Sequence, residues 1–215
     1  MTSYIKNNLF KLITANIILI YAVGILTITF SNDSMRGVIL GLTPVNLIMN
    51  LVMLLTFHKI WDRSFILSSL FIALLGYFIE VIGVKTGAIF GNYTYGENLG
   101  VKVFDVPIIM SLNWFILVYS AAVILNKVKN ILLFSFLGAT LITLLDVFME
   151  PLSAKLDFWY WDLGAPIQNF IAWYLFSLVL FIIFRKINGS ITNPLAKIVL
   201  LLHFIFFIIL NVVFK

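Results

Sequence analysis

Residues 64–84 read SFILSSLFIALLGYFIEVIGV, and Glu80 is the one charged side chain in this stretch. About 20 consecutive apolar residues in a helix cross the roughly 30 Å hydrocarbon core of a bilayer, so the stretch predicts a transmembrane helix. Comparable apolar runs cover most of the chain. We interpret seven of them as membrane spans, at about 9–30, 36–57, 64–84, 106–126, 130–150, 165–186 and 195–214.

The composition of the whole chain agrees with a membrane protein. Of its 215 residues, 62% are hydrophobic and 11% are charged, and the mean hydropathy is +1.11. An average soluble domain has about 25% charged residues. The composition therefore excludes a soluble globular domain, a disordered chain and a nucleic-acid-binding protein. It predicts one all-α integral membrane domain over residues 1–215, with short loops between seven transmembrane helices.

Lysine and arginine residues indicate the orientation of these helices, because cytoplasmic loops carry an excess of them. With a cytoplasmic N-terminus, nine of the 14 Lys and Arg residues lie on the cytoplasmic side and five on the outer side. We therefore expect a multi-pass protein of the inner cell membrane with its N-terminus in the cytoplasm. The chain has no Cys, which excludes disulfides and thiolate chemistry.

Three acidic residues within the predicted helices are the candidate catalytic groups. Glu80 lies near the outer end of its span, and Asp146 and Glu150 are four residues apart, which places them on one helix face. A charged side chain at the centre of a membrane helix costs about 2.5–3.5 kcal/mol. These acids could pair with loop cations or cap helices, but three of them at one depth favour a buried polar site in the bundle interior.

Aromatic and amide side chains are expected around these acids, where they would position substrate or water. The candidates are Tyr77, Tyr93, Tyr95, Asn113, Trp114, Gln168, Asn169 and Trp173. The run Trp159–Tyr160–Trp161 is typical of an interfacial aromatic belt. In the inner halves, His203 is the one ionisable side chain well inside a helix, and a lone His is typical of a packing residue. A polar path through both leaflets is therefore missing, which argues against a transporter or channel.

The residues favour acid–base chemistry over metal chemistry. The sequence has no phosphate-binding motif and no His/Cys cluster, so we expect neither a metal nor a cofactor. The spacing of Asp146 and Glu150 is superficially similar to the Mg²⁺ motifs of membrane prenyltransferases, which need a second acidic motif and several cations. A carboxyl group in an apolar site can keep its proton and act as a general acid. Protonation of a trisubstituted alkene would give a tertiary cation that aromatic faces stabilise. Water would capture it in a hydration, and an internal double bond would capture it in a cyclisation.

The motifs around the acids resemble the carotenoid-biosynthesis membrane protein family, which includes carotenoid 1,2-hydratases and bisanhydrobacterioruberin hydratases. The first block is Glu80-x-x-Gly83-x-x-Thr86-Gly87-x-x-x-Gly91-x-Tyr93-x-Tyr95, followed by Leu99-Gly100, Val106-Pro107 and Trp114. The second is Asp146-x-x-x-Glu150-Pro151, followed by Trp159-Tyr160-Trp161 and Pro166-x-x-Asn169-Phe170-x-x-Trp173. The chain departs from the family at Glu150, where Asp is frequent, and at Leu163-Gly164-Ala165-Pro166, where a Tyr-Gly-x-Pro-like stretch is frequent.

The resemblance implies an enzyme that needs no cofactor. It would add water to the terminal 1,2 double bond of an acyclic carotenoid end group and leave a tertiary hydroxyl. Its substrate would be a long polyene dissolved in membrane lipid, and the protein could associate with other enzymes of the pathway. Two alternatives stay open, namely an end-group cyclase and a non-catalytic carotenoid- or lipid-binding partner of a pathway enzyme.

Overall fold

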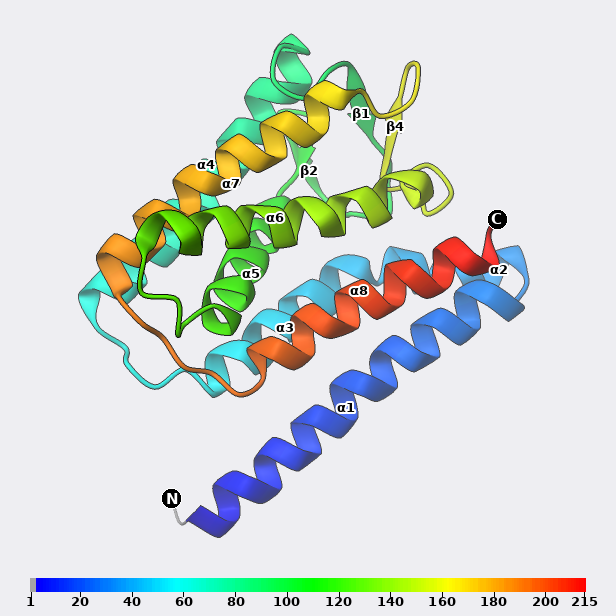
Figure 1. The fold of residues 1–215 in the computed structure, drawn as a ribbon. Helices are drawn as coiled ribbons and strands as arrows, with labels where there is room; N and C mark the ends of the chain where they lie inside the picture. Colours follow the sequence, from blue (N-terminus) through cyan, green and yellow to red (C-terminus); the bar gives the residue numbers. More distant parts are fainter. Residues whose placement is uncertain (1–2) are drawn as a thin grey trace.

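Eight α-helices run through residues 3–215, which are the residues that this computed structural model describes (Figure 1). They are α1 (Ser3–Phe30), α2 (Asp33–Gly41), α3 (Thr43–Thr56), α4 (Arg63–Thr86), α5 (Ile109–Ile124), α6 (Ile131–Met149), α7 (Ile167–Asn188) and α8 (Ala196–Val213). A short 3-10 helix, η1 (Glu150–Leu152), continues α6. Every apolar run in the sequence is therefore helical over most of its length.

The prediction of a helical membrane protein is confirmed. Within the described residues, five helices are long and apolar enough to cross a membrane, namely α1, α4, α6 with η1, α7 and α8. The pair α2 and α3 is a sixth candidate span, bent by 41°. The run at 106–126 contains α5, which has 16 residues and is shorter than the other spans. The count of seven spans and the cytoplasmic N-terminus stay predictions.

The bend between α2 and α3 has a local cause in the sequence. Pro44 lies in the first turn of α3, and proline has no backbone N–H and clashes with the carbonyl of the preceding turn. The hydroxyl of Thr43 donates to the carbonyl of Leu40 at 2.6 Å and so provides a donor at the break. The second predicted span is consequently two helices instead of one.

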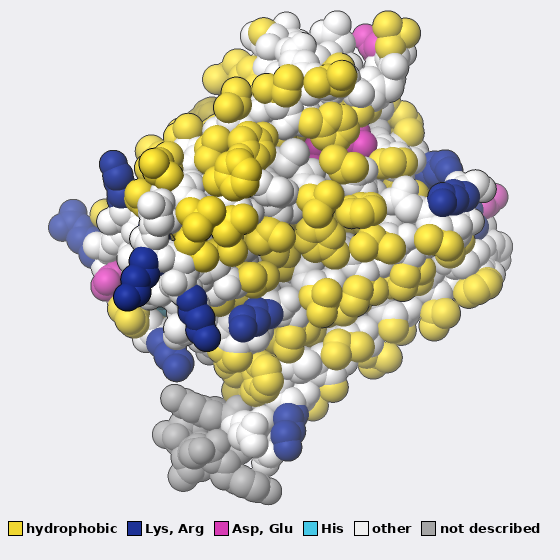
Figure 2. Space-filling view, viewed as in Figure 1, with side chains coloured by type: hydrophobic (Ala, Val, Ile, Leu, Met, Phe, Trp, Pro, Cys, Tyr) yellow, Lys and Arg dark blue, Asp and Glu magenta, His cyan; other side chains and the backbone are white. Residues whose placement is uncertain are grey.

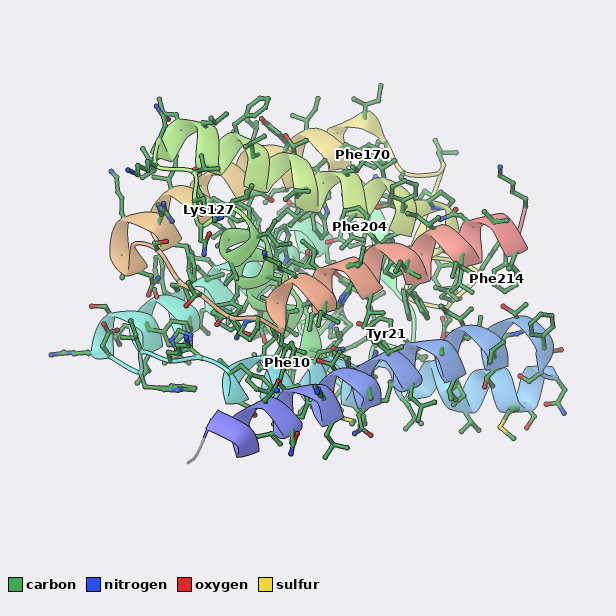
Figure 3. The ribbon with its side chains drawn as sticks, turned by 60° about the horizontal axis from the view of Figure 1, so that its bottom comes forward. Phe10, Tyr21, Lys127, Phe170, Phe204 and Phe214 are labelled. Carbon is green, nitrogen blue, oxygen red and sulfur yellow. The ribbon has the colours of Figure 1, made fainter. Side chains whose placement is uncertain are left out.

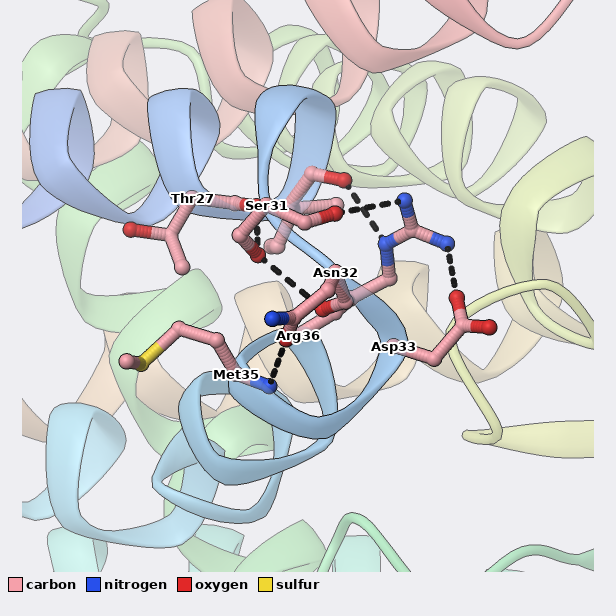
Figure 4. A network of polar contacts seen from close by, with 7 residues as sticks. Thr27, Ser31, Asn32, Asp33, Met35 and Arg36 are labelled. Carbon is pink, nitrogen blue, oxygen red and sulfur yellow. Dashed lines mark hydrogen bonds and ion pairs between the residues drawn. The ribbon is translucent and has the colours of Figure 1, made fainter.

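A polar network fixes the turn between α1 and α2 (Figure 4). The side chain of Asn32 accepts a hydrogen bond from the backbone N–H of Met35 at 2.9 Å and caps α2. The Arg36 guanidinium donates to the last turn of α1, at the carbonyl of Ile28 (2.9 Å), and pairs with Asp33. The network holds α1 beside the rest of the bundle, where α1 packs against α2 and α8.

The central helix of the bundle is α5, which is buried along most of its length. A helix that is hydrophobic on all sides is expected in the interior of a large helical protein. Figure 1 shows α1, α3 and α8 on one side of α5 and α4, α6 and α7 on the other. Figure 2 shows hydrophobic side chains over the outer surface, with Lys and Arg gathered toward its two ends, as expected for a lipid-facing surface.

Four short strands, which the all-α prediction did not include, lie in the two long loops. They are β1 (Tyr93–Tyr95), β2 (Lys102–Val103), β3 (Val106–Pro107) and β4 (Trp159–Trp161). The strands β1 and β4 pair antiparallel, with Tyr93 opposite Trp161 and Tyr95 opposite Trp159. Alternate residues of a strand point to one face, so these four aromatic residues turn inward together. This pairing joins the loop after α4 to the loop after α6.

Candidate functional site

Glu80 forms one half of the candidate site. It lies on α4 and is 2% exposed. Its Oε2 accepts hydrogen bonds from the hydroxyls of Tyr93 (2.6 Å) and Tyr95 (2.8 Å), and its Oε1 accepts one from Trp114 Nε1 (3.0 Å). The ion pairs within the described part of the chain all involve other acids. Neutral donors therefore hold both oxygens of this carboxyl group.

Two glycines on α4 allow this close packing around Glu80. A Cβ atom on Gly76 would lie 2.5 Å from the Trp114 side chain, and one on Gly83 would lie 2.5 Å from the Phe90 ring. Larger residues at either position would push the tryptophan or the loop away from the carboxyl group. Gly87 ends α4 in the left-handed conformation, with φ of +63°, which glycine adopts without steric cost and which turns the chain back toward the helix.

Asp146 and Glu150 form the other half, at the end of α6. Asn169 of α7 joins them, because its Nδ2 donates to Asp146 Oδ2 and to Glu150 Oε1, both at 2.9 Å. Glu150 Oε2 also accepts from Trp161 Nε1 (2.7 Å) and Trp159 Nε1 (3.2 Å). Asp146 is fully buried, and its Oδ1 has no hydrogen-bond partner among the described residues. The spacing of four residues thus brings the two acids to one face, as predicted.

A small cavity of about 20 Å³ lies between the two halves. Glu80 and Glu150 both line it, together with Tyr93, Tyr95, Asn169 and Trp173. One water molecule needs about 10–15 Å³ by this measure, so the cavity has room for about one water. The Trp173 ring stacks on Trp114, with centroids 4.3 Å apart, and continues the aromatic wall toward Glu80. The arrangement places a water-sized space between carboxyl groups from two different helices.

The two tyrosines on Glu80 lie in the loop, outside the helices, and act as hydrogen-bond donors. Burial, followed by the neighbouring Glu80 carboxyl, raises the pKa of both Tyr93 and Tyr95 well above the usual value of a phenol. Both hydroxyls therefore keep their protons and continue to donate to Glu80 at alkaline pH. The nearest cation along the chain, Lys85, pairs with Asp105 at the exposed end of α4, and none of the ion pairs among the described residues includes Glu80, Asp146 or Glu150.

Eight of the eleven predicted site residues meet at this cluster, and three lie elsewhere. The Tyr77 hydroxyl donates to the carbonyl of Val103 at 2.7 Å, at the bundle surface. Gln168 is exposed, and its amide donates to the carbonyls of Ala88 (2.6 Å) and Ile89 (3.1 Å) in the loop after α4. Asn113 is buried but lines a second cavity. Tyr77 and Gln168 thus fix the loops that cover the site.

Sequence reasoning missed Trp159 and Trp161, because we interpreted their run as an interfacial belt. Both indoles donate to Glu150, whereas Tyr160 between them is exposed and donates to Asp157 at 2.7 Å. Positions i and i+2 of a strand share a face, so the two tryptophans turn inward and Tyr160 turns outward. The three residues are all aromatic, so the sequence alone carried no pattern that separated this strand from an interfacial belt.

The sequence model of a family described as carotenoid biosynthesis protein matches residues 38–215. The chain belongs to this carotenoid biosynthesis family. The matched part includes Glu80, Asp146 and Glu150 and all the side chains that donate hydrogen bonds to them. The resemblance predicted from the motifs is confirmed.

One curated relative of the carotenoid biosynthesis protein is informative. The chain is 27% identical over 147 residues to a bisanhydrobacterioruberin hydratase of Haloarcula japonica, which is 64% of this chain and 50% of the relative. The chain therefore spans half the length of the curated relative that it matches. No solved structure matches the chain.

Proposed function

We propose that this carotenoid biosynthesis protein is a seven-span hydratase of the inner cell membrane, with Glu80, Asp146 and Glu150 as its acid–base groups. It would add water to the terminal 1,2 double bond of an acyclic carotenoid end group. The observation that carries the proposal is the water-sized cavity that Glu80 and Glu150 both line. The name of the Haloarcula relative, a hydratase, supports the same reaction.

The reaction can be written with these groups so that atoms and charges balance. Glu150 gives a proton to carbon 2 of the end group, and the alkene electrons form the new C–H bond, which leaves a tertiary cation at carbon 1. A water molecule in the cavity forms the C–O bond at carbon 1, and Glu80 takes up the proton that this water loses. The proton then returns from Glu80 to Glu150 through the next water, so that the cycle consumes only water and alkene.

Asp146 would act on Glu150 rather than on the substrate, because it does not line the cavity. Asn169 holds the two carboxyl groups side by side, and two neighbouring carboxylates repel each other unless they share a proton. Asp146, with its unpartnered Oδ1, would therefore help Glu150 to hold the proton that the alkene receives. The aromatic wall with Trp173 would stabilise the cation through the face of its ring.

Water would reach the site from its loop end. Glu150 and Trp161 line the small cavity and also an open depression of about 430 Å³ between the ends of α6 and α7. Ser153 and Gly164 of the loops form part of this depression. Glu150 therefore connects the buried site with the side from which water can arrive.

Co-expression with a pathway that makes an acyclic carotenoid tests the proposal. Extracted pigments are separated by chromatography, and their molecular masses are measured by mass spectrometry. A hydratase adds the mass of one water per acyclic end and leaves the absorption spectrum unchanged. Unchanged mass with a shortened chromophore would identify a cyclase instead. Unchanged pigment, with the protein present in the membrane, would favour a non-catalytic binding partner and would contradict the proposal.

A further inference from the structure

A second cavity lies directly beside the small cavity that Glu80 and Glu150 line. Its volume is about 80 Å³, and Met110 and Trp159 form a wall that the two cavities share. Its other walls come from α1, α3, α5, α6 and α8 and from the two long loops, and most of the lining is apolar, with Leu47, Met149 and Phe207 among the residues. This space is larger than one water needs and could hold a branched hydrocarbon group next to Glu80 and Glu150.

Tyr21 of α1 is one of the polar residues that line this second cavity. Its hydroxyl accepts a hydrogen bond from Asn50 Nδ2 at 3.2 Å and lies 3.2 Å from Nδ1 of His203 on α8. Figure 3 shows Tyr21 on the side of α1 that faces α8. His203, expected from the sequence to be a packing residue, therefore takes part in a polar contact that ties α1 to α3 and α8 across the membrane interior.

The second cavity adjoins a third hollow at the hydrophobic surface of α1. This hollow of about 310 Å³ lies between α1, α2 and the start of α3, and Tyr21, Thr43, Asn46 and Phe206 line both spaces. Its outer rim includes Leu19 and Val23, which are exposed on the hydrophobic surface of α1, together with Gly24 and Ile39. Three adjoining hollows thus lie in a row between the lipid face at α1 and the carboxyl groups.

We propose that these adjoining hollows together form the binding slot for the apolar polyene arm of the substrate, and that the arm enters sideways from the lipid between α1 and α2. This inference rests on the proposed function for the reacting end only. The slot opens where a polyene dissolves, its lining is mainly apolar, and its inner end adjoins Glu80 and Glu150. The opposite opening at Glu150 lies among loop residues and suits water instead.

The slot gives α1 a specific role. The family match begins at residue 38, so α1 lies outside the matched part, although it supplies Tyr21 and Gly24 to the slot. Residues of α1 would contact the arm of the substrate, because they line the outer hollows and not the small cavity with Glu80 and Glu150. Changes at the mouth should therefore discriminate between substrates by the length of the arm.

The test is Gly24→Phe, with Leu26→Phe as the matched control. A Cβ atom at Gly24 would lie 3.8 Å from the Phe206 ring, so a phenylalanine there fills the mouth of the slot, whereas Leu26 is 56% exposed on the same helix and does not line it. Each purified protein is compared with wild type for the polyene it retains in detergent and for conversion of two substrates. One substrate is a long acyclic carotenoid, and the other is a short acyclic isoprenoid with the same end group.

We expect Gly24→Phe to lower retained polyene and conversion of the long substrate by about tenfold, and to change conversion of the short substrate by less than about twofold. Leu26→Phe should match wild type throughout. Unchanged retention and conversion in Gly24→Phe would overturn the slot, and so would an equal loss for both substrates. Ile39→Trp closes the same mouth from α2 and replaces Gly24→Phe if that variant does not fold. A third outcome separates the two proposals. If wild type retains the polyene, the mouth variant does not, and neither forms hydrated product, the proposed hydratase is refuted and the binding slot is supported.

Discussion

Asn169 should be the residue whose loss most disturbs the carboxyl cluster without removing a carboxyl group. Its Nδ2 gives Asp146 the one hydrogen bond that this side chain accepts and gives Glu150 one of three. Asn169→Leu keeps a side chain of similar size and removes both donors. A buried polar group that loses its partner costs about 1–3 kcal/mol. Since Glu150 keeps two indole donors, we expect a total loss of about 2–4 kcal/mol in the free energy of unfolding.

The neighbouring Gln168 offers a matched control for this variant. Gln168 is exposed and bonds only to loop carbonyls, where water can replace its amide. Gln168→Leu should therefore cost less than about 1 kcal/mol. Both variants are unfolded reversibly by SDS in mixed micelles, and product formation is measured in parallel. An Asn169→Leu protein with the stability and activity of wild type would show that the amide does not hold the acids in place.

Three further changes probe the Glu80 half of the site. Glu80→Gln should lower product formation by at least about 100-fold, because an amide cannot take a proton from water, and the variant should still elute as a folded protein in size-exclusion chromatography. Gly83→Ala should cost about 1–3 kcal/mol in SDS unfolding, since its Cβ would meet the Phe90 ring at 2.5 Å; an unaffected protein would mean that the loop is not packed on α4 as described. Burial raises the pKa of Tyr93 and of Tyr95, so the folded protein binds these two protons more tightly than the unfolded chain does. The free energy of unfolding should therefore fall as pH rises above the ordinary phenol pKa of about 10. The Tyr93→Phe/Tyr95→Phe double variant should show a smaller loss over that pH range, and an identical loss would contradict the burial of these phenols.

The sequence was sufficient for the helices and the acids, because both depend on short-range patterns. Apolar runs of span length appear as helices, and the four-residue spacing of Asp146 and Glu150 places both on one face of α6. Pro44, in the first turn of α3, was a readable signal for the bend, but length and hydropathy alone treated the run at 36–57 as one span. Patterns of this kind carry no information on which face of a helix meets a particular neighbour.

The partners of each acid depend on contacts between distant parts of the chain. Trp159 and Trp161 reach Glu150 because β4 pairs with β1, a contact that joins two loops far apart in sequence. Gln168 is next to Asn169, but successive helix positions turn by about 100°, and the Gln168 amide donates to the loop after α4. Tyr77 is three residues before Glu80 and on nearly the same helix face, yet its hydroxyl donates to the carbonyl of Val103 and not to the acid. Proximity in sequence was therefore a poor guide to membership of the site.

The most direct test of the account is hydration by the purified protein in heavy-oxygen water. Wild type and Glu80→Gln are each incubated with an acyclic carotenoid. The mass and the amount of hydrated product are then measured by mass spectrometry. Wild type should form a product that carries one heavy oxygen atom for each hydrated end, and Glu80→Gln should form at least about 100-fold less of that labelled product. A wild-type product without heavy oxygen, or an equal amount of labelled product from the variant, would contradict the assignment of Glu80 as the group that activates water.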